Sequence, residues 1–426
     1  MGIGTRKRRR DEPVAIPSAE DSQRDAVISR LFDGVLRSAR SQLLRAESPL
    51  AAEVWGSGLM AVWDRLPANP GEDAATTFAE ALVRHAAELG TQEGMAVLAA
   101  LTAVAPSRVA TRARTAAAML EQDGVAAPAW AAVAGKALPT EAWIGADVYG
   151  DQEIVIIGFA YPTLQGDPGH SICVLVDHTE GGVAKDAYPA APLAQTLARW
   201  REAEGDGISL RPASLAEVAA RLADALLATD FGGLHLPPPT HGTRTDGRTL
   251  AEMRALLASR LTTLPPAANT GLEELDADGR DWLVAEFLGS PEAADLLSEP
   301  AAVTVCHSLI AYRCDYGDGD PLRWSPTLAG LCLLDHFPVK VSLDAPDIPL
   351  VPDVLAAWVT FAAGRKNLPE PALARILEVI DSCRDTFPVA MSDADRYSPA
   401  KRKAMDLIRG GVDLTEDEAS WAAVGN

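Results

Sequence analysis

The segment from Glu153 to Tyr188 decides the fold class and reads EIVIIGFAYPTLQGDPGHSICVLVDHTEGGVAKDAY. It contains three short runs rich in β-branched residues, separated by a Gly- and Pro-containing loop and by a Glu-Gly turn. Long Ala- and Leu-rich segments with helical spacing of apolar residues flank it on both sides. The sequence therefore predicts a three-stranded antiparallel meander within an otherwise helical protein.

The Glu-Gly turn predicts a two-residue hairpin, which places Asp177 opposite Ala184. Because side chains alternate between the two faces of a strand, Asp177 and Asp186 are expected on one face and His178 and Lys185 on the other. The strand at 171–178 carries apolar residues on both faces. We therefore expect an interior strand that is covered on both sides.

The remaining segments predict an α+β protein that is predominantly helical, with a helical bundle before the sheet, helices covering the sheet and a helical domain after it. Strands are also expected at 142–149 and 208–211. The expected domains are a basic tail at 1–22, a helical bundle at 23–138, an α+β domain at 139–230, a linker at 231–248 and a helical domain at 249–426.

Composition and charge limit the classes of function. The formal net charge of −21 disfavours nucleic-acid binding by the body of the protein, since phosphate would be repelled. No apolar run reaches the roughly 18–20 residues that span a bilayer, and the basic N-terminus lacks the apolar region of a secretory signal. Five cysteines without a CxxC pair indicate reduced thiols and a cytoplasmic location.

A basic cluster near the N-terminus is the exception to the acidic character. It consists of Arg6, Lys7, Arg8, Arg9 and Arg10. One interpretation is an arm that contacts nucleic acid or an acidic partner; the other is a solvated tail without a partner. Nucleic acid is expected as a partner only through this arm.

The candidate catalytic residues lie at the predicted hairpin. They are Asp177, His178, Asp186 and His170, because carboxylates beside a histidine can support general acid–base chemistry. The expected register weakens this hypothesis, since it separates His178 from both aspartates. The same residues are also typical of a solvated hairpin end.

Two further groups were weighed as metal ligands, and no metal site is predicted. Asp315, Asp318 and Asp320 lie close together, but their spacing does not match an EF-hand loop, and Asp and Gly also favour turns. His235 and His241 lie in the expected linker without an acidic residue at helical spacing. Nucleotide-binding motifs such as GxxxxGK[ST] are missing, so the cofactor is unknown.

Two blocks resemble an uncharacterised protein family of GC-rich bacteria: VDHTEGGVAKDAY at 176–188, and DPLRWSP at 320–326 with LLDHFPVKV at 333–341. The resemblance covers about half of the chain and implies no activity.

The leading functional hypothesis is a cytoplasmic interaction or regulatory module that works through binding. The alternatives are a hydrolase-like or metal-assisted enzyme with its site at the 170–186 hairpin, and a nucleic-acid-associated protein that uses the basic arm. A polar cleft beside Asp177 and Asp186 would favour the enzyme. A flat or apolar groove would favour binding.

Overall fold

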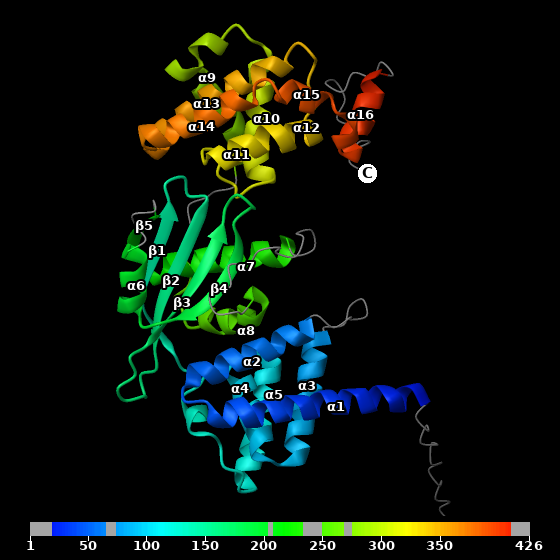
Figure 1. Cartoon of the computed structure of the whole chain (residues 1–426), viewed down its shortest axis with the longest axis vertical. Helices are drawn as coiled ribbons and strands as arrows, with labels where there is room; N and C mark the ends of the chain where they lie inside the picture. Colours follow the sequence, from blue (N-terminus) through cyan, green and yellow to red (C-terminus); the bar gives the residue numbers. More distant parts are fainter. Residues whose placement is uncertain (1–18, 65–73, 203–207, 233–248, 268–274, 410–426) are drawn as a thin grey trace, which may run out of the picture. The chain divides into compact units, whose positions relative to one another are not determined.

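The computed structural model describes residues 19–64, 74–202, 208–232, 249–267 and 275–409. Within them the chain has the expected predominantly helical α+β fold (Figure 1). Contacts divide it into two compact units. The first comprises Met1–Lys136 and Ala251–Ser259, and the second comprises Ala137–Leu250 and Arg260–Asn426.

The first unit is helical. Its elements are α1 (Ala19–Gln42), η1 (Leu43–Arg45), α2 (Pro49–Asp64), α3 (Ala74–Leu89), α4 (Gln92–Val104), α5 (Ser107–Gln122), η2 (Ala129–Ala132) and most of α8 (Leu250–Leu261). Helix α4 lies at the centre, since most of its side chains are buried. Thr91 caps its N-terminus by accepting a hydrogen bond from the N–H of Gly94. Helix α5 begins at Ser107, and Pro106 takes its N-cap position without a side-chain hydrogen bond.

Most of helix α8 belongs to the first unit, whereas the sequence placed it in a C-terminal helical domain of 249–426. Ser259 Oγ donates a hydrogen bond to the carbonyl of Ala103 at 3.0 Å, and Ala255 packs against the apolar core of the first unit. Most of the expected linker, from residue 233 to 248, lies outside the described residues.

The second unit contains one antiparallel sheet with the strand order β4-β3-β2-β1-β5. The strands are β1 (Leu138–Asp147), β2 (Gln152–Ala160), β3 (His170–Asp177), β4 (Val183–Ala190) and β5 (Ile208–Ala213). The predicted meander is therefore confirmed as β2, β3 and β4, and the two further expected strands correspond to β1 and β5.

Helices cover both faces of the sheet, as the apolar pattern of β3 predicted (Figure 1). Leu197 of α6 (Leu193–Glu202) packs with Ile156 and Cys173 on one face. On the other face, Arg221 of α7 (Leu215–Gly232) forms an ion pair with Glu153 at 2.7 Å. Interior strands of this kind have no solvated face, which explains why their sequence is apolar throughout.

The predicted hairpin register is correct at one pair and wrong at the tip. Leu175 lies opposite Asp186 as expected, but Asp177 pairs with Val183 because a β-bulge shifts the register. The loop between β3 and β4 is also longer than the predicted two-residue turn. A bulge inserts one residue and re-aims the side chains that follow it. Lys185 consequently reaches Asp177, with Nζ 2.6 Å from Oδ2, although the two were expected on opposite faces.

The helices that follow α8 enclose a second apolar core in the second unit. They are α9 (Ala277–Leu288), η4 (Pro291–Leu296), α10 (Ala301–Asp315), α11 (Pro326–Leu331), η5 (Cys332–His336), α12 (Phe337–Lys340), η6 (Ile348–Leu350), α13 (Val351–Lys366), α14 (Glu370–Cys383), α15 (Phe387–Ser392), η7 (Ala394–Arg396) and α16 (Pro399–Arg409). Phe287 lies against Trp358, with ring centroids 5.0 Å apart, in the middle of this core. No helix in the described part of the chain is long and apolar enough to cross a membrane.

Candidate functional site

Two hairpin loops of the sheet meet the segment that joins α10 to α11. Asp147 shapes the β1–β2 loop, because its carboxylate accepts hydrogen bonds from the N–H groups of Tyr149 and Gln152 at 2.8 and 2.9 Å. Gly150 has a φ of +72° and presents its carbonyl oxygen to the guanidinium of Arg323. A side chain at this glycine would collide with that guanidinium, so the close approach requires glycine.

Asp318 forms the centre of a buried ion-pair cluster beside these loops. Its side chain is 4% exposed and accepts a hydrogen bond from Arg313, whose side chain is 1% exposed. The Nε atom of Arg323 lies 2.6 Å from the other carboxylate oxygen of Asp318. Arg313, which is shielded from water, and Arg323, which is 18% exposed, thus share one buried carboxylate, and this makes the cluster costly to disrupt.

His178 lies against this cluster as a neutral side chain. Its Nδ1 atom is 3.5 Å from Asp318 Oδ2, a distance at which an ion pair would form if the imidazole were protonated. Burial, with the positive charge of Arg323 adding to it, lowers the pKa of His178 to about 4. The contact is therefore not an ion pair at neutral pH. The backbone N–H of His178 donates to the carbonyl of Asp151 at 2.7 Å, which joins the two hairpin loops.

The pKa of Asp151 is raised, whereas the pKa of an exposed carboxylate that is paired with a cation is lowered. Burial and the nearby charge of Asp147 raise the pKa of Asp151 to about 6, against the lowering effect of a hydrogen bond with Ser325 and of the charges of Arg323 and Arg313. The loop cluster therefore contains a carboxylate that titrates near neutral pH.

The structure places Asp177, His178 and Asp186 near one end of β3 and His170 at the other end. Asp177 and His178 are neighbours, but Asp177 binds Lys185 and accepts hydrogen bonds from the N–H and hydroxyl of Thr179 at 2.9 and 2.6 Å. Burial would raise the pKa of Asp177, but these hydrogen bonds outweigh it and lower the pKa. Asp186 is 9% exposed and accepts a hydrogen bond from the N–H of Ala187.

His170 lies at the other end of β3, about 23 Å from Asp177 along the strand at the rise of roughly 3.3 Å per residue. It stacks between Phe159 and Tyr161, with centroid distances of 5.8 and 5.4 Å. Burial and the charge of Arg260 lower its pKa to about 4. His170 is therefore a buried core side chain that packs against two aromatic rings, and it does not form a site with the two aspartates.

The three aspartates of the Asp- and Gly-rich segment, Asp315, Asp318 and Asp320, each have a basic partner. Asp315 pairs with Arg280 at 2.6 Å, and Asp320 pairs with Lys366 at 2.6 Å, while Asp318 holds the two arginines described above. Within the described residues, no group of three or more His, Cys, Asp or Glu side chains is arranged to hold a metal ion.

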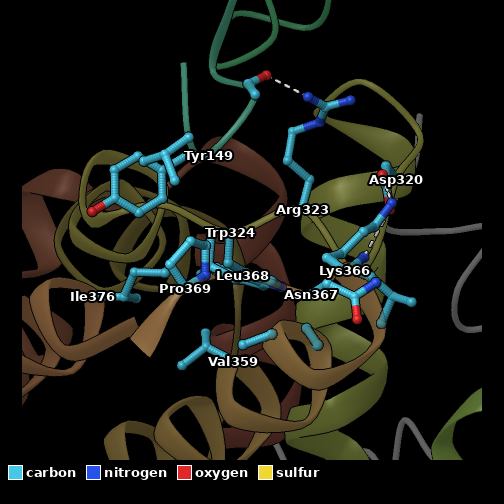
Figure 2. Close-up of a pocket in the computed structure, with 15 residues that line it drawn as sticks. Tyr149, Asp320, Arg323, Trp324, Val359, Lys366, Asn367, Leu368, Pro369 and Ile376 are labelled. Atoms are coloured by element: carbon cyan, nitrogen blue, oxygen red, sulfur yellow. Dashed lines mark hydrogen bonds and ion pairs between the residues drawn. The ribbon is translucent and has the colours of Figure 1, made fainter. Parts of the chain in front are cut away.

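A cavity of about 210 Å³ opens beside the cluster (Figure 2). We call it the Arg323 pocket; it is lined by residues 148–150 of the β1–β2 loop and by residues within 320–324 and 359–376. Its floor consists of Trp324, Val359, Ala362 and Ile376, which are at most 3% exposed.

Polar groups form the rim of the Arg323 pocket. Figure 2 shows Arg323 reaching the backbone of the β1–β2 loop and Lys366 reaching Asp320. On another side of the rim, the hydroxyl of Tyr149 donates to the carbonyl of Ala372 at 3.3 Å, so the loop is fastened to α14. Asn367, the C-cap of α13, also lies at the rim with a φ of +53°.

Sequence reasoning identified the 315–326 segment but not what it contacts. Arg313, Arg323 and Asp151 carried no motif. The available signal was the concentration of charged residues within 313–323, next to apolar helical segments, which predicts that these residues form pairs but not with which partner.

No protein-family model, curated protein or solved structure matches this chain. The resemblance to a family of GC-rich bacteria therefore stays a prediction from the quoted blocks.

Proposed function

We propose that this protein is an interaction or regulatory module that works by binding a ligand in the Arg323 pocket. The observation that carries the proposal is the construction of the pocket from three segments that are distant in the sequence. Ligand sites are usually concave, with an apolar lining and a few fixed polar groups. The Arg323 pocket has an apolar floor and a rim held by Arg323, Lys366 and Tyr149.

The rim is held in place before any ligand arrives. Arg323 is bound to Gly150 and Asp318, and Lys366 is bound to Asp320. Because these side chains are already ordered, a ligand would lose less conformational entropy in ordering them. Preorganisation of this kind supports binding.

The catalytic alternative at the 170–186 hairpin has less support. Asp177 and Asp186 are not among the residues that line the Arg323 pocket, and Asp177 is held by Lys185 and Thr179. The nucleic-acid alternative depends on Arg6–Arg10, which lies outside the described residues. The cytoplasmic location remains part of the proposal and is supported by five cysteines that form no disulfide.

Saturation-transfer NMR with a fragment library would test the proposal on the full chain. Ala363 lines the pocket and is 6% exposed, so Ala363→Phe should fill the space and abolish binding of pocket fragments. Ala285→Phe adds the same ring at an exposed position of α9 and should leave binding unchanged.

A second variant covers the case in which Ala363→Phe does not fold, as judged by circular dichroism. Lys366→Met changes the rim without adding bulk, and its side chain is 46% exposed. If the fragments bind the wild type and both pocket variants with the same affinity, the protein does not bind them through this pocket.

A further inference from the structure

The floor of the Arg323 pocket sets the size and polarity of the ligand body. Its volume of about 210 Å³ exceeds the ~150 Å³ of an engineered apolar cavity that holds benzene. Trp324, Val359, Ala362 and Ile376 offer it no side-chain charge. The indole N–H of Trp324 is already donated to the carbonyl of Pro321 at 3.0 Å. An apolar group about as large as a benzene ring therefore fits the floor.

The rim sets the chemistry of the ligand head. A guanidinium has five N–H donors and an ammonium has three. The described contacts of Arg323 engage its Nε and one terminal nitrogen, and the described contact of Lys366 engages Asp320 alone. Both cations thus keep donors for a ligand.

The one carboxylate in the lining does not compete for this role. Asp320 is 6% exposed, and its two oxygens accept from Lys366 and from the N–H of Leu322 at 2.6 and 3.0 Å. Hydrogen bonds and charge from Lys366, with the charge of Arg323, lower the pKa of Asp320 despite its burial. The negative charge of Asp320 is therefore compensated by Lys366. The groups of Arg323 and Lys366 that remain available to a ligand are hydrogen-bond donors.

We infer that the ligand of the Arg323 pocket is a small monocarboxylate with an apolar body, an inference that rests on the proposed function. The carboxylate accepts from Arg323 and Lys366 at the rim, and the body lies on the floor around Trp324. Hydrogen bonds between ionised groups are about twice as strong as neutral ones, so the head contributes charge-assisted bonds. A phosphate or a dicarboxylate would bring polar oxygens onto the floor, where they lose water without finding a partner.

Three probes with the same ring and different heads test the inference: benzoate, benzamide and benzylamine. They are titrated into the full chain at pH 7.5 and low salt, with ligand-observed NMR as the readout. We expect benzoate to bind about tenfold or more tightly than benzamide, since only benzoate forms charge-assisted hydrogen bonds. Benzylamine should not bind, because its ammonium has no lone pair to accept the remaining N–H groups of Arg323 and Lys366.

Matched variants locate the effect. Lys366→Met should weaken benzoate binding about tenfold and leave benzamide binding nearly unchanged. Arg365→Met removes the adjacent positive charge on α13, which pairs with Glu286 and does not line the pocket, so it should leave both affinities unchanged.

The outcomes separate the ligand class from the proposed function. If benzoate does not bind, or binds no better than benzamide, while other fragments bind and are lost in Ala363→Phe, the ligand class is wrong and the pocket still binds. If benzoate binds equally to the wild type and to Ala363→Phe, its site lies elsewhere and the inference is overturned. If no fragment depends on Ala363, the proposed function itself fails.

Discussion

Replacing Asp318 with asparagine removes the negative charge of the carboxylate that both Arg313 and Arg323 contact. The side chains of Asp318 and Arg313 are 4% and 1% exposed, so water cannot take over the role of the carboxylate. Removal of one partner from a buried pair costs about 3–5 kcal/mol. The asparagine keeps one acceptor oxygen, and we therefore expect a loss of about 3 kcal/mol in the free energy of unfolding at pH 7.5.

Asp315→Asn provides the matched control in the same segment. Asp315 also pairs with an arginine at 2.6 Å, but its side chain is 44% exposed and that of Arg280 is 25% exposed. Exposed pairs contribute about 0–1 kcal/mol, because water solvates the partners when the pair is broken. The two variants share the chemical change and differ in burial.

Urea unfolding followed by circular dichroism and tryptophan fluorescence measures both variants, with separate transitions fitted where the curves show more than one. Urea m-values of about 1–3 kcal/mol per M convert a loss of about 3 kcal/mol into a midpoint shift of at least about 1 M. The shift for Asp315→Asn should stay below that for Asp318→Asn. Equal shifts for the two variants would refute the reasoning that burial of the Asp318 cluster makes its ion pairs indispensable.

Three further outcomes are expected. Val174→Asp should cost several kcal/mol, on the order expected for an unpaired buried charge, because Val174 is fully buried on an interior strand; an unchanged thermal midpoint would contradict this. The raised pKa of Asp151, about 6, means that the folded wild type loses stability as the pH rises from 3.8 through 6. Asp151→Asn should therefore gain stability relative to the wild type as the pH rises from 5 to 8, measured as the difference in Tm. A pH-independent difference would rule out Asp151 as the titrating group. Trypsin should cut first at Arg244 or Arg248 in the Pro- and Gly-rich segment, and the fragments should stay together in gel filtration, because the second unit contains residues from both sides of the cut; separation without unfolding would indicate independent domains.

The elements with local signals were predicted well. The helices at 92–104 and 370–383 begin and end where the spacing of apolar residues and the flanking Gly and Pro predict, because these signals act within a few residues. The apolar residues on both faces of the strand around Val174 predicted an interior strand for the same reason. The register at Asp177 failed, since the bulge near Lys185 depends on contacts across two strands, which a turn motif does not encode.

The sequence by itself determined the fold class, the strands of the meander and most helix bounds, because propensity and periodicity are properties of neighbouring residues. Only the tertiary structure decided the site. Gly150 and Arg323 are 173 residues apart and meet through one hydrogen bond, and the pocket beside them needs a third segment from α13 and α14. A charged side chain that becomes buried needs a partner of opposite charge. Which residue becomes that partner depends on which loops the packed cores bring together. That choice depends on the packing of the whole second unit, and no short motif contains it.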